Sequence, residues 1–214
     1  MSTQDLLADE AKYCSFGDTV HYIDPPKIFN RCEGSFLYDE ANVPFLDLQM
    51  WYSAVNFGYG NERLNNAVKK QLDTLPQLAS QYLHKEKIEL ATHIAKRVEK
   101  TYGLKGRVQF NVGGSQSVED SLKLVRNATG GKSLMFAFEG GYHGRTLGAS
   151  AITSSYRYRR RFGHFGERAM FLPFPYPFRR PKGMSAEEYS AACVHNFRSE
   201  EHTSELQSRL HLVC

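Results

Sequence analysis

A glycine pair between an apolar run and a helical pattern is the first feature of this sequence whose residue types could do chemistry. It reads Phe-Asn-Val-Gly-Gly-Ser-Gln over residues 110–116. Glycine lets backbone amides approach a ligand closely, and the unpaired amides of a helix N-terminus attract anions. Gly114 and Ser115 are therefore candidate donors to a phosphate group. A tight strand-to-helix turn that binds nothing would also need glycine, so this loop alone leaves both interpretations open.

A second glycine-rich loop, Gly-Gly-Tyr-His-Gly-Arg over residues 140–145, follows the next apolar run of the chain. Ligands of open α/β sheets bind in the crevice at the carboxyl ends of the strands. Tyr142 could stack on a flat heterocycle there, and His143 could form a hydrogen bond to the edge of the ring. The alternative is a surface loop with an exposed tyrosine and a solvated histidine.

Together the two loops predict a binding site for a phosphorylated aromatic molecule. They follow neighbouring predicted strands, so a phosphate would meet the amides of Gly114 and Ser115 while a planar ring would meet Tyr142. Pyridoxal 5′-phosphate combines these two groups and is the cofactor that the pair of loops predicts.

The elements that must position these loops alternate between short apolar strands and helices. Strands are predicted at residues 107–111, 133–139 and 169–174, and helices at residues 116–129 and 146–152. Such alternation indicates an α/β fold with a parallel sheet. A capping box, Ser185 with Glu188, starts a last helix whose amphipathic pattern ends at Phe197.

In the upstream part of the chain the spacing of apolar residues predicts a hairpin and two helices. Alternating apolar residues on both sides of a polar turn predict a β-hairpin at residues 34–47. Apolar residues at i, i+3 and i+4 predict amphipathic helices at residues 61–75 and 86–102, which Pro76 and Gly103 end.

Composition places the chain among ordinary globular proteins. It has 214 residues, of which 41% are hydrophobic and 23% charged, and a net charge of +4. No apolar run approaches the roughly 20 residues of a membrane-spanning helix, and the first residues do not resemble a secretory signal. We therefore expect no membrane association and a cytoplasmic location. The four cysteines are scattered without zinc-like or disulfide-like spacing, so no metal site is predicted.

Ordered motifs over residues 34–174 resemble those of the class III (ω-amino acid) aminotransferases, pyridoxal-phosphate enzymes of fold type I. The family string Phe-x-Asn-Ser-Gly-Ser-Glu-Ala-x-Glu is matched in register at Phe110, Gly114, Ser115 and Glu119, and Asn111 stands one residue before the position of the family's Asn. The element Phe-x-Gly-Tyr-His-Gly-Arg-Thr is matched from Phe138 to Thr146, with one spacing difference. Segments 37–39, 45–47 and 56–58 resemble the family's N-terminal hairpin and pocket segment. Gln116 stands where the family usually has Glu, and residues 50–54 and 59–62 depart from its pocket strings, so the substrate stays open.

The resemblance implies a role for each site residue. The amides of Gly114 and Ser115 would hold the cofactor phosphate, Tyr142 would stack on the pyridine ring, and His143 would support it. Trp51 and Tyr52 would line the substrate entrance, although plain aromatic packing is an equal alternative for both. The family also implies a homodimer that uses an amino acid or amine as donor and a 2-oxo acid as acceptor. The fold would be an incomplete fold type I, with a small-domain and entrance segment at residues 1–60 and the first part of the large cofactor-binding domain at residues 61–197.

Two groups that transamination needs are missing from this chain. The family's Schiff-base lysine and the aspartate that holds the pyridine nitrogen lie downstream of the Tyr-His-Gly element, and neither of their strings occurs here. The lysines in reach, Lys123, Lys132 and Lys182, stand in polar turns or on a helix surface. Residues 198–208 match the in-frame translation of a common sequencing adapter that begins AGATCGGAAGAGC. We therefore expect residues 198–214 to be a non-native tail and the polypeptide as written to be an inactive fragment.

Two other functions stay open at this point. Another fold type I enzyme, such as a decarboxylase, aminomutase or racemase, would use the same cofactor site. A nucleic-acid-binding role is suggested by the basic and aromatic run from Arg157 to Phe162. The sheet context favours a loop of solvated arginines instead, so no nucleic-acid partner is expected.

Overall fold

The computed structural model describes residues 1–15, 21, 23, 25–159, 162–163 and 168–203. The chain divides into two compact units, Met1–Glu86 and Lys87–Cys214, and each is described by itself. The assignment of residues 1–60, 61–197 and 198–214 to separate functional parts stays a prediction. Residues 204–214 of the expected tail lie outside the described residues.

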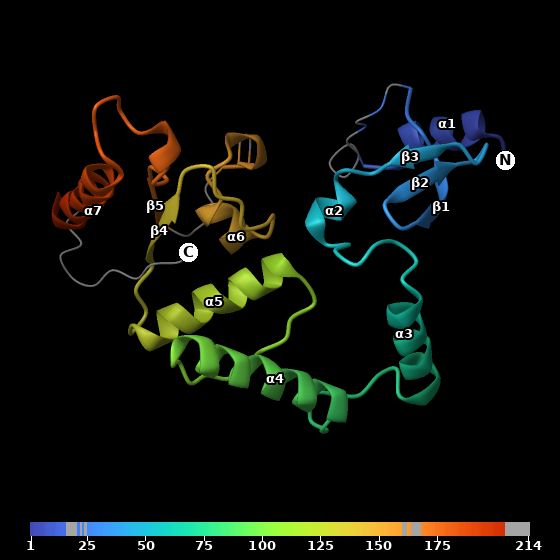
Figure 1. The fold of residues 1–214 in the computed structure, drawn as a ribbon, viewed down its shortest axis with the longest axis horizontal. Helices are drawn as coiled ribbons and strands as arrows, with labels where there is room; N and C mark the ends of the chain where they lie inside the picture. The colour runs from blue at the N-terminus through green and yellow to red at the C-terminus, as the bar shows by residue number, and fades with distance from the viewer. Residues whose placement is uncertain (16–20, 22, 24, 160–161, 164–167, 204–214) are drawn as a thin grey trace. The chain divides into compact units, whose positions relative to one another are not determined.

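The first unit is built on a small antiparallel sheet that follows helix α1 (Thr3–Tyr13) (Figure 1). Its strands β1 (Phe29–Glu33), β2 (Phe36–Asp39) and β3 (Pro44–Leu46) pair in that order. The hairpin predicted for residues 34–47 is thus confirmed as β2 and β3, whereas β1 was not predicted. Asp39 closes the turn because its Oδ1 accepts from the amides of Ala41 (3.1 Å) and Val43 (2.9 Å).

A short turn, α2 (Met50–Ser53), leads from the sheet to helix α3 (Glu62–Thr74). The backbone returns to the sheet between them, where Gly34 and Tyr59 exchange two hydrogen bonds of 3.0 and 2.7 Å. Asn61 caps α3 by accepting from the amide of Leu64 at 3.1 Å. The helix predicted for residues 61–75 is confirmed.

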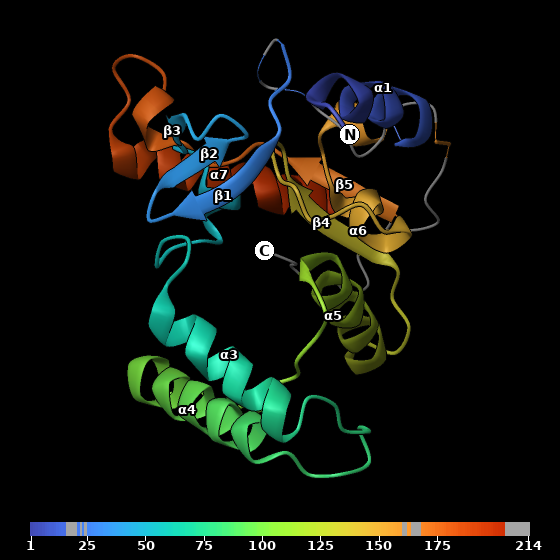
Figure 2. The same ribbon diagram turned by 90° about the vertical axis from the view of Figure 1, so that its right-hand side faces the viewer.

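The second unit places a two-stranded parallel sheet between two helical layers. Strands β4 (Leu134–Phe138) and β5 (Arg168–Leu172) pair with Leu134 opposite Arg168. Helices α5 (Gly114–Ala128) and α6 (Leu147–Ile152) cover one face, and α7 (Ala186–Thr203) covers the other (Figures 1 and 2). Helix α4 (Lys85–Tyr102) precedes them and ends at Gly103, whose φ is +69°. Two 3-10 turns, η1 (Tyr156–Tyr158) and η2 (Pro177–Arg179), flank β5.

Side chains that alternate along β4 build the packing on both faces. Met135 and Ala137 are buried with Leu122 of α5 and Ile152 of α6. The buried ring of Phe136 instead meets Phe197 of α7 edge-on, with centroids 5.4 Å apart. This period of two explains why a nearly continuous apolar run forms a strand that is covered on both faces. The predicted parallel arrangement is confirmed.

The prediction of a strand at residues 107–111 was wrong. This segment is irregular, because a strand needs a neighbour for its backbone hydrogen bonds and none of the described strands pairs with it. Helix α7 also differs from the prediction: it starts at the expected capping box but continues past Phe197 to Thr203. Arg198, Glu200 and Glu201 of this segment have high helix propensity, which favours continuation of the helix without an amphipathic pattern.

Candidate cofactor site

The N-terminus of α5 provides the candidate phosphate-binding groups. Gly113 is its N-cap residue, with extended backbone (φ −179°, ψ 169°) and no side-chain cap. Its carbonyl accepts the first helical hydrogen bond from the amide of Ser117 at 3.0 Å. The amides of Gly114 and Ser115 therefore lie in the first turn, at the positive end of a 15-residue helix. The helix begins two residues earlier than predicted, which places both donors inside it.

The loop after β4 meets this helix terminus directly. The amide of Arg145 donates to Ser115 Oγ at 3.4 Å. Gly144 lies so close that a Cβ at its position would be 2.2 Å from Ser115 Oγ, and its φ is +136°. The two loops that the sequence singles out are thus in contact, and a glycine at residue 144 makes the contact possible.

Tyr142 lies in an aromatic and cationic cluster beside that contact. Tyr142 is 53% exposed, and its ring meets that of Tyr158 edge-on at 5.0 Å between centroids. The guanidinium of Arg145 lies 5.0 Å from the Tyr158 ring centroid. A hydrogen bond between the side chains of Arg145 and Tyr142 raises the pKa of Arg145 above its ordinary value. An exposed tyrosine ring with fixed neighbours is suited to stacking on a planar ligand. The arginine of the Tyr-His-Gly-Arg motif was present in the sequence pattern, but its contacts with both rings were not predicted.

His143 is partly buried, and this burial lowers the pKa of its imidazole below the ordinary value. At neutral pH the ring is therefore uncharged and can donate one hydrogen bond and accept another. Its backbone amide donates to Oγ1 of Thr153 at 3.0 Å. Thr153 is fully buried, and its hydroxyl donates to the Ala149 carbonyl of α6 at 2.8 Å. Thr153 thus fixes the backbone of the loop of residues 140–145, a role that no sequence motif indicated.

Trp51 and Tyr52 lie in the first unit, on a turn with unusual backbone. Met50, Trp51, Tyr52 and Ser53 all have φ between +47° and +65°, so α2 is a left-handed turn. Left-handed backbone costs about 1–2 kcal/mol for each non-glycine residue. Trp51 and Tyr52 are 69% and 73% exposed. Their role at a substrate entrance stays a prediction.

Asp47 holds this strained turn in place. Its Oδ1 accepts from the amides of Gln49 (2.9 Å) and Met50 (3.1 Å), and its Oδ2 accepts from the Tyr59 hydroxyl at 2.7 Å. The Tyr59 hydrogen bond is the main cause that lowers the pKa of Asp47, and the same bond raises the pKa of Tyr59 to about 12. The two side chains thus form one anchor.

We expect the order of the turn to depend on pH in two windows. The folded pKa of Asp47 is lowered, so its support is present above about pH 4 and is lost as the pH falls through that pKa. The folded pKa of Tyr59 is raised, so its support is present below about pH 10 and is lost as the pH rises towards 12. Trp51 is the chain's one tryptophan, so its fluorescence anisotropy measures both changes. Tyr59→Phe should remove the alkaline change; an unaltered alkaline change in that variant would contradict the prediction.

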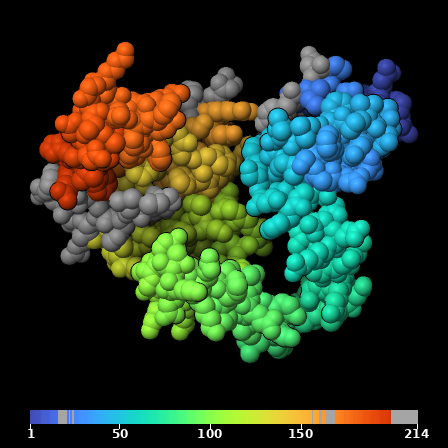
Figure 3. Space-filling model, in the orientation of Figure 1, coloured from blue at the N-terminus to red at the C-terminus, as the bar shows by residue number. Residues whose placement is uncertain are grey.

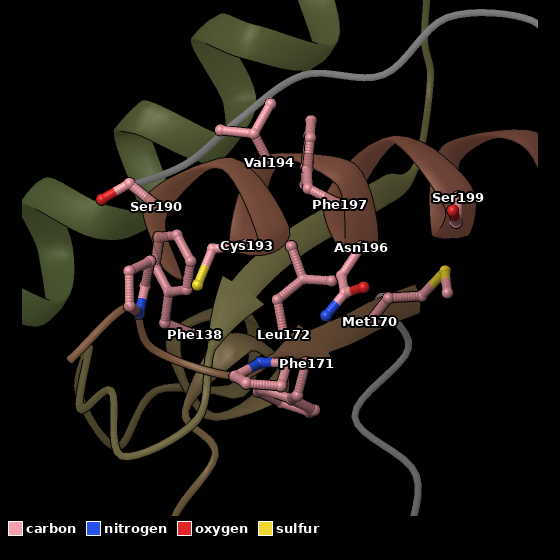
Figure 4. Close-up of a pocket in the computed structure, with 12 residues that line it drawn as sticks. Phe138, Met170, Phe171, Leu172, Ser190, Cys193, Val194, Asn196, Phe197 and Ser199 are labelled. Carbon is pink, nitrogen blue, oxygen red and sulfur yellow. The ribbon is translucent and has the colours of Figure 1, made fainter. Parts of the chain in front are cut away.

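A cavity of about 580 Å³ lies between the sheet and α7 (Figure 4). None of the predicted site residues lines it, and its lining carries no charged side chain; the lining includes Phe138, Leu172, Cys193, Asn196 and Phe197. Such a cavity is unsuited to a phosphate. Among the described residues there is no group of His, Cys, Asp and Glu that could hold a metal ion. No helix in the same residues is long and apolar enough to cross a membrane.

The basic run that suggested nucleic-acid binding contacts aromatic rings of this chain. The guanidinium of Arg157 lies 5.7 Å from the Tyr158 ring centroid, and that of Arg159 lies 4.8 Å from the ring of Phe171. Residues 160–161 lie outside the described residues. Because these aromatic faces already carry arginines, they are poorly placed to stack on bases.

Comparison with known proteins identifies related sequences. The model of the family described as aminotransferase class-III matches residues 20–206. Acetylornithine aminotransferase of Archaeoglobus fulgidus is 31% identical over 173 residues, which cover 81% of this chain and 44% of that protein. Alanine/serine racemase of Pyrococcus horikoshii is 28% identical over 187 residues, 86% of this chain and 38% of that protein. The chain therefore spans less than half the length of these curated relatives.

A solved structure shows the same fold. Taurine:2-oxoglutarate aminotransferase from Bifidobacterium kashiwanohense, in complex with PLP and glutamate, superposes with a TM-score of 0.82 at 21% identity. The superposition covers 99% of this chain and 48% of that one. It confirms the predicted α/β architecture as part of the fold that this enzyme adopts.

Proposed function

The chain belongs to the class-III aminotransferase family, and from this premise we propose that it provides the phosphate-binding and ring-binding part of a pyridoxal-phosphate-dependent aminotransferase. The observation that carries the proposal is the contact between the uncapped N-terminus of α5 and the loop of residues 140–145. A phosphate ligand and a planar ring attached to it need these two elements side by side.

Each residue of the site has a distinct task in this proposal. The amides of Gly114 and Ser115 donate to the cofactor phosphate, where the helix dipole adds to the attraction. Tyr142 stacks on the pyridine ring, and the neutral imidazole of His143 supports the ring's position. The cofactor, when bound, supplies an electron-accepting ring that stabilises negative charge on the amino substrate.

The substrates of the proposed reaction are an amino acid or amine and a 2-oxo acid. We propose that Trp51 and Tyr52 line the entrance through which both pass. Their exposure on an anchored, left-handed turn supports this, because backbone strain persists where the surrounding structure enforces it and is common at ligand-binding sites.

A racemase is the second candidate, since one relative is an alanine/serine racemase. Both activities would use the same cofactor site, as would a decarboxylase or an aminomutase. An assay of the complete enzyme with a single L-amino acid separates the first two. Racemisation changes the optical rotation without a 2-oxo acid, whereas transamination requires one and consumes it.

We also propose that the complete enzyme is a cytoplasmic homodimer. Apolar side chains of α3 (teal in Figure 3) support a subunit contact: Leu64, Val68 and Leu72 are between 48% and 59% exposed. Such an apolar stripe on a helix is commonly covered by another surface. The scattered cysteines, which form no disulfide framework in the sequence, support a reducing compartment.

Binding of pyridoxamine 5′-phosphate tests the cofactor site without any covalent step, because this amine form does not react with lysine. We expect the chain to bind it with one-to-one stoichiometry in calorimetry and inorganic phosphate to compete. Tyr142→Ala should weaken binding up to about tenfold, since an aromatic stacking contact contributes about 0.5–1.5 kcal/mol. Tyr142→Phe, which keeps the ring, should bind within about twofold of the unaltered chain by the same reasoning. Absence of saturable binding would refute the proposed site.

A further inference from the structure

Glu119 of α5 connects the two halves of the candidate cofactor site. Its Oε1 accepts three hydrogen bonds from the start of α6: from the Thr146 hydroxyl, from the amide of Gly148 at 2.8 Å and from the amide of Ala149 at 3.0 Å. Thr146 is the N-cap residue of α6, yet it makes no side-chain cap of its own. The Glu119 carboxylate thus does for α6 what an N-cap side chain ordinarily does.

The local packing is arranged around this carboxylate. A Cβ at the position of Gly148 would lie 2.5 Å from Glu119 Oε2, so a glycine is needed for the side chain to approach. Glu119 is partly buried and its three partners are all neutral donors of one short segment. A carboxylate in such a setting is an acceptor that holds backbone in position.

Glu119 lies one helical turn after Ser115, on the same face of α5. Ser115 contacts Gly144 and the Arg145 amide, while Glu119 holds the first turn of α6. At the other end of α6, Thr153 accepts from the His143 amide. The ring-binding loop is therefore joined to α5 directly at Ser115 and indirectly through Glu119 and α6.

We propose that Glu119 is a positioning residue that couples the phosphate-binding turn of α5 to the ring-binding loop. This rests on the proposed function, because it assumes that one ligand spans both elements. Without Glu119 the phosphate site would keep its geometry, since the amides of Gly114 and Ser115 belong to α5 itself. The ring of Tyr142 would lose its fixed distance from that site.

The coupling is tested by measuring separately the affinity for pyridoxamine 5′-phosphate, which has a ring and a phosphate, and the affinity for inorganic phosphate. For Glu119→Ala we expect the affinity for pyridoxamine 5′-phosphate to fall about tenfold, a loss of about 1.4 kcal/mol. The affinity for inorganic phosphate, measured by its displacement of pyridoxamine 5′-phosphate, should change by no more than about twofold. A role in general stability alone would lower both affinities together.

Two further variants and one control sharpen the test. Glu119→Gln should recover most of the affinity, because all three hydrogen bonds end on Oε1 and a carboxamide oxygen can accept them. Thr146→Val removes one of the three donors and should cost about threefold, so it tests the coupling if Glu119→Ala does not fold. Asp120→Asn is the matched control, since this neighbouring carboxylate contacts Gln109 and Lys123 instead.

The outcomes separate the inference from the function on which it rests. If the unaltered chain does not bind pyridoxamine 5′-phosphate, the proposed function fails and the inference fails with it. If the unaltered chain binds, the inference alone is overturned by any of three results. These are an unchanged affinity in Glu119→Ala, an equal loss for both probes, and a loss in Glu119→Gln as large as in Glu119→Ala.

Discussion

Replacing Gly144 with alanine is expected to weaken binding of pyridoxamine 5′-phosphate severely. A Cβ at this position would lie 2.2 Å from Ser115 Oγ, 2.8 Å from Ser115 Cβ and 3.1 Å from Ala149 Cβ. The backbone also has φ +136°, which alanine rarely adopts. Strain and overpacking each cost about 1–3 kcal/mol, and because the Cβ atoms of Ser115 and Ala149 are also close, rotation of the Ser115 hydroxyl does not relieve the overlap. We expect the free energy of unfolding to fall by about 3 kcal/mol and the affinity for pyridoxamine 5′-phosphate to fall at least about a hundredfold.

Gly140→Ala is the matched control for this prediction. Gly140 lies in the same loop with φ +81°, but a Cβ there would meet nothing within 4 Å. It therefore measures backbone strain alone, about 1 kcal/mol, and should leave the affinity within about threefold. Thermal or urea unfolding gives the stability of both variants, and calorimetry gives their affinities. Equal losses of affinity in the two variants would show that the contact with Ser115 does not matter.

Local patterns in the sequence predicted most elements of the fold. Helices α3, α4 and α5 have apolar residues at helical spacing together with their own end signals, such as Asn61 and Gly103. The prediction failed where the local structure depends on contacts with residues outside the segment itself. Residues 107–111 have an apolar pattern suited to a strand but no pairing strand among the described residues. The left-handed turn at Trp51 depends on Asp47 and Tyr59, and no propensity indicates it.

The candidate site was predictable to the same extent. Glycines next to Ser115 and Tyr142 marked both loops, because chemistry at a backbone amide or a stacking ring restricts residue types locally. Glu119 and Thr146 are 27 residues apart in the chain, so their contact exists only once α5 and α6 pack together. The buried hydroxyl of Thr153 has no distinctive spacing either. The groups that we propose bind a ligand could be singled out in the sequence, whereas the groups that position them could not.

The polypeptide of 214 residues is expected to show no transaminase turnover and to form no specific covalent adduct with pyridoxal phosphate. The reaction needs a lysine held against the cofactor by its surroundings. Lys123 is 79% exposed on α5, and its Nζ lies 3.8 Å from the carboxylate of Asp120 rather than against the candidate site. Lys182, the one lysine after Tyr142, is exposed in the turn before α7. Neither has the burial that turns a lysine into a nucleophile at neutral pH.

Borohydride reduction after incubation with pyridoxal phosphate, followed by peptide mass spectrometry, measures this directly. We expect scattered modification of exposed lysines that pyridoxamine 5′-phosphate does not prevent, because those lysines lie outside the cofactor site. A full-length relative such as the Archaeoglobus fulgidus enzyme should instead give one modified lysine that the competitor protects. The same pattern in the present chain would contradict the prediction. Non-covalent binding together with absent covalent capture would show that holding the cofactor and activating it reside in different parts of the parent enzyme.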